Sequence, residues 1–326
     1  MSTPSPTPGS PGAAPVTVAA IQMVSTPRLE ENLARARHWI GEAARQGAAL
    51  VSLPEYFCLM GHKDTDKLPF AERPGDFDAP IQGTLSRAAR EHGVWILGGT
   101  LPMAIPGAPV PAERVRNTTC VFAPDGSLSA RYDKLHLFCY DNGRERYDEA
   151  RVLEAGEAPV TVDAAIPGGP ALRVGLSICY DLRFPELYRA MSFSGERPLD
   201  LISVPAAFTF TTGQAHWELL LRARAVENQA YVIAAAQGGT HENGRRTWGH
   251  SMIVDPWGEV LACVPEGEGL AVARIDPARI AQVREQLPAL QLRRLCAPED
   301  QPPTLSLESG PLRAIGARLA QARCPA

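Results

Sequence analysis

Hydrophobic residues recur along the first part of the chain with two alternating periods, that of a strand and that of an amphipathic helix. Residues 16–24 begin with apolar residues at every second position and predict a strand. Residues 28–46 carry apolar side chains at steps of three and four, which predicts a half-buried helix that Gly47 can end. Residues 48–53 are a continuous apolar run, typical of a strand covered on both faces. This order predicts a βαβ unit in a buried sheet.

The same alternation of strands and helices continues through the rest of the chain. Turn residues, among them Pro124-Asp125-Gly126 and Pro256-Trp257-Gly258, predict two hairpins. No linker-like break interrupts residues 16 to about 290, which favours one α/β domain. The further predicted elements are a helix over 81–92, a strand over 94–98, a hairpin of 118–123 and 128–132, strands over 172–178, 199–204 and 231–236, helices from Pro185 and His216, and a hairpin of 247–255 and 259–264.

Composition excludes several classes of protein. The 326 residues are 45% hydrophobic and 21% charged, the balance of a globular protein with a substantial core. The formal net charge is −4 and no basic block occurs, so we expect no nucleic-acid partner, because phosphate binding needs clustered Lys and Arg. No stretch approaches the ~20 apolar residues of a membrane span, so no membrane partner is expected.

The ends of the chain differ in amino-acid composition from its middle. Residues 1–15 are Ser, Thr, Pro, Gly and Ala without the charge or apolar run of a secretory signal, so we predict a disordered tail and a cytoplasmic protein. The predicted domain spans 16–290, and 291–326 form a C-terminal extension with a weak helical pattern over 311–323, to which we assign no function. The seven cysteines lack close pairing, which fits reduced thiols better than a disulfide framework.

Three reactive side chains stand where predicted strands have just ended: Glu55, Lys134 and Cys179. Functional sites of α/β sheets collect at these strand ends. Taken singly, each residue has an ordinary explanation, namely a solvated turn, a surface lysine and an inert core thiol. Together they supply a thiol to attack, a carboxylate to take its proton and an ammonium group to hold an oxyanion. The combination indicates cleavage of a carbon–nitrogen bond.

The segments around these residues resemble the signature blocks of the nitrilase superfamily of carbon–nitrogen hydrolases, and the likeness extends over about residues 16–290. It is greatest to the branch that holds ω-amidase and deaminated glutathione amidase. The resemblance implies an α-β-β-α sandwich of two stacked mixed sheets with outer helices, a homodimer, and no metal or organic cofactor. The three blocks are Leu53-Pro54-Glu55, Tyr132-Asp133-Lys134-Leu135-His136-Leu137-Phe138 and Cys179-Tyr180-Asp181-Leu182-Arg183-Phe184-Pro185-Glu186-Leu187.

The resemblance also implies roles for individual residues. It assigns the catalytic triad to Glu55, Lys134 and Cys179, with the backbone N–H of Tyr180 as a second oxyanion donor. A second glutamate of the family matches Glu149, in the block of residues 147–150. The alternative for Glu149 is a surface acid, because the neighbouring residues are highly charged.

Arg183 and Thr209 match residues that bind the substrate's carboxylate in the related amidases. An arginine suits this role because its guanidinium group can bind a carboxylate with two parallel hydrogen bonds. The alternative for Arg183 is a structural ion pair with Asp181 or Glu186.

Other polar residues near the blocks are expected to be structural. His136 and His216 are expected to hold loops by hydrogen bonds, since the triad needs no imidazole to move its protons. Cys58 lies three residues after Glu55 and is expected to be a packed core residue.

The predicted reaction is hydrolysis of a small, acidic, linear amide of the deaminated glutathione or ω-amide type. It proceeds through a thioester on Cys179 and releases an amine or ammonia. The same triad could serve a nitrile hydrolase or an N-carbamoyl hydrolase, and an acyltransferase would use the same thioester. A catalytically inactive scaffold that acts through protein partners is the alternative from another class, and the presence of all three triad residue types weighs against it.

Overall fold

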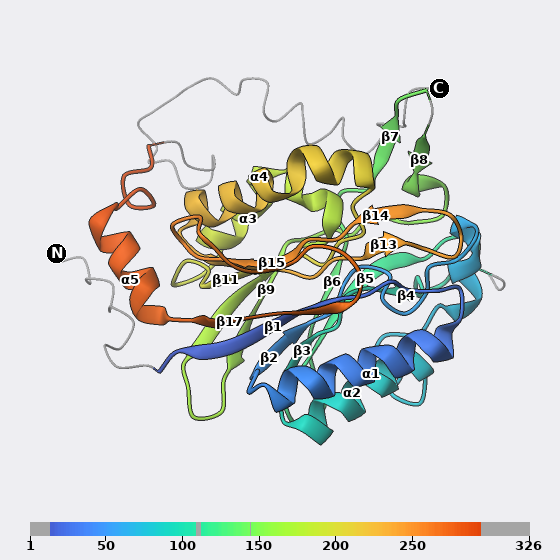
Figure 1. Cartoon of the computed structure of the whole chain (residues 1–326), viewed down its shortest axis with the longest axis horizontal. Helices are drawn as coiled ribbons and strands as arrows, with labels where there is room; N and C mark the ends of the chain where they lie inside the picture. The colour runs from blue at the N-terminus through green and yellow to red at the C-terminus, as the bar shows by residue number, and fades with distance from the viewer. Residues whose placement is uncertain (1–13, 109–111, 144, 295–326) are drawn as a thin grey trace.

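Two mixed β-sheets lie face to face between two pairs of helices (Figure 1). The computed structural model describes residues 14–108, 112–143 and 145–294. Helices α1 and α2 cover the outer face of one sheet, and α3 and α4 cover the outer face of the other. The α-β-β-α sandwich predicted from the sequence is therefore confirmed.

The first sheet has seven strands in the order β17-β1-β2-β3-β5-β4, with β6 paired to β5. Strands β1, β2 and β3 are parallel to one another, and the other pairs are antiparallel. The pairing of β1 with β17 brings together segments from near both ends of the described chain. The strands are β1 (Val16–Gln22), β2 (Leu50–Ser52), β3 (Trp95–Leu97), β4 (Leu101–Met103), β5 (Arg116–Phe122), β6 (Leu128–Asp133) and β17 (Gly269–Ile275).

The second sheet has six strands in the order β16-β15-β12-β11-β10-β9, with the central β10, β11 and β12 parallel. Two short hairpins lie outside both sheets: β7 (Cys139–Asp141) with β8 (Arg146–Asp148), and β13 (Gly238–Thr240) with β14 (Arg246–Trp248). The strands of the second sheet are β9 (Val160–Ala165), β10 (Ala171–Leu176), β11 (Leu201–Ser203), β12 (Tyr231–Ala234), β15 (Ser251–Val254) and β16 (Val260–Val264).

Helices account for most of the remaining regular structure. The α-helices are α1 (Leu29–Arg45), α2 (Pro80–His92), α3 (Pro185–Phe193), α4 (Phe210–Asn228) and α5 (Pro277–Gln286). The 3₁₀-helices are η1 (Asp64–Phe70), η2 (Glu149–Arg151) and η3 (Cys179–Arg183). Among the described residues, no helix is long and apolar enough to cross a membrane.

Strand β1 lies between two parts of the hydrophobic core, one on each of its faces. Val18 and Ala20 point into the core between the two sheets, together with residues of β10 and β12. Ala19 and Ile21, which alternate with them, point into the core between the first sheet and helices α1 and α2. A strand that is apolar on both faces has to be covered on both faces, and this accounts for the continuous apolar runs in the sequence.

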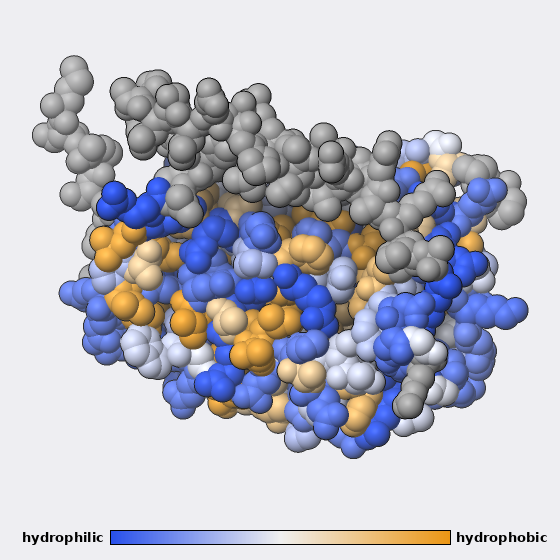
Figure 2. Space-filling view, turned by 90° about the horizontal axis from the view of Figure 1, so that it is seen from above, coloured by the Kyte–Doolittle hydropathy of each residue, from blue (hydrophilic) through white to orange (hydrophobic). Residues whose placement is uncertain are grey.

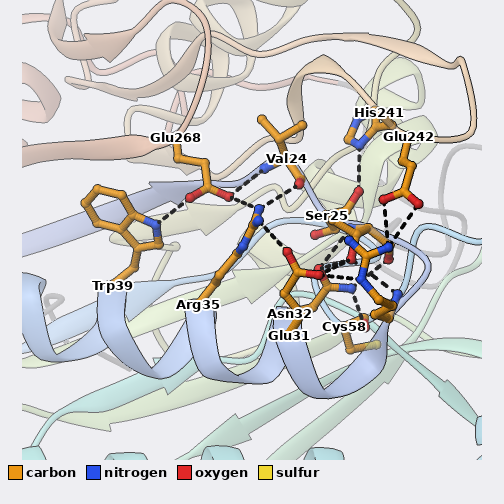
Figure 3. A network of polar contacts seen from close by, with 12 residues as sticks. Val24, Ser25, Glu31, Asn32, Arg35, Trp39, Cys58, His241, Glu242 and Glu268 are labelled. Carbon is orange, nitrogen blue, oxygen red and sulfur yellow. Dashed lines mark hydrogen bonds and ion pairs between the residues drawn. The ribbon is translucent and has the colours of Figure 1, made fainter.

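A polar network ties the N-terminal part of α1 to loops that follow β13 and β16 (Figure 3). Arg35 on α1 pairs with Glu268 at 3.1 Å, and Trp39 donates its indole N–H to the same carboxylate. The ring of His241 is buried and its Nδ1 lies 2.9 Å from the carbonyl oxygen of Ser25. Ser25 also donates its hydroxyl hydrogen to the Phe57 carbonyl oxygen at 2.8 Å, which holds the segment after β1 close to the segment that carries Glu55.

Two boundaries predicted from the sequence were wrong. Helix α4 begins at Phe210 rather than at His216, because the Thr209 hydroxyl caps its N-terminus. The sequence did not indicate this start, because apolar residues lie on several sides of the helix and give no clear helical period. The predicted strand over 247–255 is two strands, β14 and β15, in different sheets. Gly249 and His250 interrupt it, and both have positive φ angles, of 73° and 56°.

Other differences concern elements and residues without a local signal. Strands β4, β7, β8, β9, β13 and β17, helix α5 and the 3₁₀-helices were not predicted. Reduced thiols are confirmed for Cys58, Cys120, Cys179 and Cys263, which are free, but not for Cys139, which is disulfide-bonded. The helical pattern over 311–323 lies outside the described residues.

Gly99, which lies between β3 and β4, is predicted to be important for stability because no side chain fits there. It has a φ of +54°, and a Cβ added to it would lie 2.2 Å from the Pro54 carbonyl oxygen, one residue before Glu55. Gly99→Ala combines backbone strain with this clash and should lower the free energy of unfolding by about 3 kcal/mol or more. Gly47→Ala is the control, because Gly47 also has a positive φ but open space, and it should cost about 1 kcal/mol. Equal losses of the two variants in urea unfolding would mean that the contact with Pro54 costs nothing.

Candidate active site

Glu55, Lys134 and Cys179 meet at one end of the two stacked sheets. Glu55 follows β2 and Lys134 directly follows β6, so both come from the first sheet, whereas Cys179 follows β10 of the second sheet. Lys134 Nζ lies 2.9 Å from Glu55 Oε1, and Glu55 is a hydrogen-bond partner of the Cys179 thiol. The three side chains predicted from separate motifs therefore form one cluster.

The ammonium group of Lys134 is fully buried between two carboxylates. Its Nζ lies 2.8 Å and 3.1 Å from the two oxygens of Glu149, in addition to its contact with Glu55. Burial disfavours the charged form, but the charges of Glu149 and Glu55 outweigh burial and raise the pKa of Lys134 well above its usual value. Lys134 is therefore a permanent cation within the cluster.

Both oxygens of Glu55 are held by groups from other elements. Asn117 on β5 donates its Nδ2 hydrogen to Oε1 at 2.8 Å, and the backbone N–H of Ala207 donates to Oε2 at 2.9 Å. The backbone N–H of Lys134 in turn donates to the Asn117 carbonyl oxygen at 2.9 Å. Asn117 thus fixes the carboxylate and the lysine relative to each other.

Glu149 lies inside the cluster rather than on the surface, where the alternative interpretation had put it. Its carboxylate accepts hydrogen bonds from the Tyr56 hydroxyl at 2.8 Å and from the Phe138 N–H at 2.7 Å. Burial opposes its charge, but Lys134 outweighs burial and lowers the pKa of Glu149. Burial and the charge of Glu149 raise the pKa of Tyr56 well above its usual value, so Tyr56 remains a donor.

Cys179 occupies a strained turn between a strand and a helix. Its φ is +50°, a region that non-glycine residues rarely adopt, and its N–H donates to the Pro205 carbonyl oxygen at 2.9 Å. The next residue, Tyr180, lies in the first turn of η3, where backbone N–H groups have no intrahelical acceptor. Burial and then Glu55 raise the pKa of Cys179 well above its usual value, so the resting thiol is protonated.

The fully buried carboxylate of Asp181 joins the lysine loop to the cysteine loop. It accepts hydrogen bonds from the Tyr132 hydroxyl at 2.7 Å and from the backbone N–H groups of Ile178 and His136. The His136 ring also contacts Asp181, with Nδ1 at 2.6 Å, and stacks on Phe184. The prediction that His136 holds loops is therefore confirmed.

Arg183 faces the same pocket as the cluster. It contacts the His216 ring at 3.2 Å and lies over the rings of Tyr180 and Phe208, and within the described part of the chain it forms no ion pair with Asp181 or Glu186. The pocket, of about 340 Å³ with its open mouth, is lined by Glu55, Tyr56, Phe138, Glu149, Cys179, Tyr180, Arg183, Ala207, Phe208, Thr209, Thr212 and Arg245. The predicted residues Arg183 and Thr209 thus lie at one cavity with Cys179.

Comparison with known proteins identifies the family. Residues 17–285 match the family model described as carbon-nitrogen hydrolase. The chain belongs to the carbon–nitrogen hydrolase family. This hydrolase is 44% identical over 281 residues to deaminated glutathione amidase of Synechocystis, a match that covers 86% of this chain and 98% of that relative. It is 39% identical over 280 residues to human omega-amidase NIT2, covering 85% of this chain and 94% of the relative.

A solved structure supports the same assignment. The hydrolase superposes on Saccharomyces cerevisiae Nit3, a member of branch 10 of the nitrilase superfamily, with a TM-score of 0.76 and 30% identity. The match covers 88% of this chain and 100% of the yeast chain. The family predicted from the three sequence blocks is therefore confirmed.

Several residues of the site were missed in the sequence. Asn117 and Tyr56 bind the two glutamates, and Arg245 reaches the pocket from the loop before β14. The position of Tyr56 directly after Glu55 was the one sequence feature that could have pointed to these residues.

Among the residues that the structure describes, no group of three or more His, Cys, Asp or Glu side chains could hold a metal ion.

Glu149→Gln should move the pH dependence of this hydrolase. The substitution removes a charge that raises the pKa of Lys134, so Lys134 should lose its proton at lower pH. We expect kcat/KM to fall about tenfold or more and its alkaline decline to begin at lower pH. Glu154→Gln is the control, since Glu154 pairs with Arg116 outside the pocket. Identical pH profiles for the two variants would contradict a role of Glu149 in the site.

Proposed function

We propose that this carbon–nitrogen hydrolase is an amidase for small linear amides that carry a carboxylate, of the deaminated glutathione or ω-amide type. The observation that carries the proposal is the cluster of Cys179, Glu55, Lys134 and Glu149 at a pocket that Arg183 also faces. The names of the two relatives, a deaminated glutathione amidase and an omega-amidase, support the same substrate class.

The first half of the reaction forms a thioester and releases the amine. Cys179 Sγ attacks the amide carbon while Glu55 takes the thiol proton, so a thiolate never has to exist alone in the buried site. Lys134 and the backbone N–H of Tyr180 hold the oxyanion of the tetrahedral intermediate. When the carbon–nitrogen bond breaks, Glu55 returns the proton to the leaving nitrogen, which departs as ammonia or an amine.

The second half of the reaction hydrolyses the thioester. Glu55 takes a proton from water, the hydroxide adds to the thioester carbon, and the same two donors hold the second oxyanion. The carbon–sulfur bond then breaks, the thiol of Cys179 regains its proton from Glu55, and a carboxylic acid is the second product. The amide and one water molecule are the only reactants that the cycle consumes.

The acyl half of the substrate is proposed to bind toward Arg183. Among the described residues, this guanidinium group has aromatic rings and an imidazole around it instead of a carboxylate, which leaves its charge available to a ligand. Thr209 supports the same wall of the pocket by capping α4.

We further propose that the protein is a cytoplasmic homodimer. Figure 2 views the molecule from the side of α3 and α4 and shows apolar areas among the polar ones. Leu219 and Val226 on α4 and the nearby Trp257 are 68%, 45% and 54% exposed. Exposed apolar side chains of this size suit burial against a second copy of the chain.

Cys179→Ala is predicted to abolish turnover of an ω-amide without unfolding the protein. Loss of the nucleophile should lower kcat at least 10³-fold, roughly, as measured by ammonia release. Cys58→Ala is the matched control, because Cys58 is also buried but does not line the pocket, and it should keep near-normal activity. Residual activity within tenfold of the unsubstituted protein in Cys179→Ala would exclude the thioester mechanism.

Arg183→Lys should raise KM for an amide that carries a carboxylate, and this rise should be about tenfold larger than the rise for the neutral methyl ester of the same amide. The reason is that lysine cannot bind the carboxylate with two parallel hydrogen bonds. The comparison needs steady-state kinetics of both substrates with both proteins. An equal change for the acid and the ester would assign Arg183 to structure.

A further inference from the structure

The peptide group between Glu55 and Tyr56 is strained, and it lies next to the catalytic cluster. Tyr56 has a φ of 55°, in the left-handed region that residues other than glycine rarely adopt. Such a conformation persists only where the surrounding contacts enforce it. Rotation of this peptide group would relieve the strain of Tyr56 and would displace the backbone that carries the Glu55 carboxylate. The contacts of the peptide group therefore affect the position of the proposed base.

Two buried side chains bind the two polar atoms of this peptide group. Gln237 donates an Nε2 hydrogen to the Glu55 carbonyl oxygen at 3.1 Å, and the Tyr56 N–H donates to Thr100 Oγ1 at 2.9 Å. Gln237 and Thr100 are both 0% exposed. Thr100 lies directly before β4 of the first sheet, and Gln237 lies between β12 of the second sheet and β13. The peptide group is therefore held by segments that adjoin strands of both sheets.

The side-chain amide of Gln237 is itself fixed in one orientation. The Ser25 N–H donates to Gln237 Oε1 at 3.0 Å, and Gln237 Nε2 donates its second hydrogen to Ser25 Oγ at 2.8 Å. The buried His241 ring binds the Ser25 carbonyl oxygen and so holds Ser25 in turn (Figure 3). Both donor hydrogens and the oxygen of the amide thus have partners, and a flipped amide would place Oε1 against the Glu55 carbonyl oxygen.

Neither Gln237 nor Thr100 lines the catalytic pocket. Both side chains are uncharged, so their effect on the reaction has to pass through the backbone that they bind. That backbone carries two side chains of the site: the Glu55 carboxylate contacts the Cys179 thiol, and the Tyr56 hydroxyl donates to the second glutamate of the cluster. A rotation of the peptide group would therefore move both side chains relative to their partners.

We propose that Gln237 and Thr100 are positioning residues, which hold the peptide group after Glu55 so that the carboxylate faces the Cys179 thiol. This inference rests on the proposed amidase mechanism, in which Glu55 takes the thiol proton. Loss of either contact should impair the chemical steps, because a misplacement of about 1 Å at the reacting groups can lower a rate about 10²-fold. Substrate binding should change little, since the acyl half is proposed to bind toward Arg183. The expected result is a fall in kcat at nearly constant KM.

The first test compares Thr100→Val with Thr100→Ser. Valine keeps the shape of the buried side chain but cannot accept the Tyr56 N–H, whereas serine retains the hydroxyl. Thr100→Val should lower kcat for an ω-amide about tenfold or more and keep KM within about threefold, and Thr100→Ser should keep kcat within about threefold. Gln237→Leu removes the contact on the other side of the peptide group and should also lower kcat about tenfold or more. The small change in Thr100→Val keeps the test decisive if Gln237→Leu does not fold.

Gln82→Leu is the matched control for Gln237→Leu. Gln82 is also 0% exposed, and its amide makes the same set of hydrogen bonds: Oε1 accepts from a backbone N–H, and Nε2 donates to two oxygen atoms. It lies on α2, outside the catalytic pocket. Both leucine variants should lose stability in urea unfolding, but only Gln237→Leu should lose kcat. Equal losses of kcat in the two variants, or an unchanged kcat in Thr100→Val, would overturn the positioning role and leave the amidase function intact.

The second test determines whether Thr100 acts through Glu55. Glu55→Gln should slow the reaction of iodoacetamide with Cys179, followed by mass spectrometry, because glutamine cannot take the thiol proton. Thr100→Val should slow this reaction when Glu55 is present but add no further slowing in the Glu55→Gln protein. Additional slowing there would mean that Thr100 acts on Cys179 by another route, and it would overturn the proposal. An unchanged kcat in Glu55→Gln would overturn the proposed mechanism itself, and the positioning role with it.

Discussion

The burial of one ammonium group is the constraint on which the rest of the site depends. The side chain of Lys134 is 0% exposed, and an unpaired charge at such depth would be prohibitive, so two carboxylates must meet it. Glu55 comes from the end of β2 and Glu149 from η2, and each is held by further donors, Asn117 and Tyr56. Removing one partner of a buried ion pair typically costs about 3–5 kcal/mol. The requirement for charge pairing therefore holds three segments together: the one after β2, the one after β6 and η2.

The strained cysteine completes this arrangement from the opposite sheet. Cys179 belongs to the loop after β10, and a φ of +50° is tolerated there because the Pro205 carbonyl oxygen and the Asp181 carboxylate fix the surrounding backbone. Asp181 also binds Tyr132 and His136, on either side of Lys134. Cys179 and Lys134, the proposed nucleophile and the proposed oxyanion donor, are thereby placed by one buried carboxylate, although they follow strands of different sheets.

The sequence predicted what depends on local pattern and on residue type. The apolar runs predicted the strands that position the triad, and the chemistry of Glu55, Lys134 and Cys179 predicted their grouping. Asn117 could not be found this way, because a polar residue at the start of a strand gives no sign of what it binds. Strand β17 pairs with β1 from about the other end of the domain, and such long-range pairing leaves no periodic signal of its own. The start of α4 was missed because Thr209 acts as a cap, which depends on backbone geometry.

In the proposed mechanism, the charge balance of the cluster explains why attack and proton transfer belong to one step. With Glu55 and Glu149 ionised and Lys134 protonated, the resting cluster carries one net negative charge, and a thiolate would add a second to a buried site. Burial and then the charge of Glu55 therefore raise the pKa of Cys179 despite the neighbouring lysine. Once Glu55 accepts the thiol proton, the two glutamates and the lysine together become neutral, and Lys134 is released from one of its two anionic partners. The proposed mechanism uses this change, because the charge of Lys134 is then available to the oxyanion at the moment when that oxyanion forms.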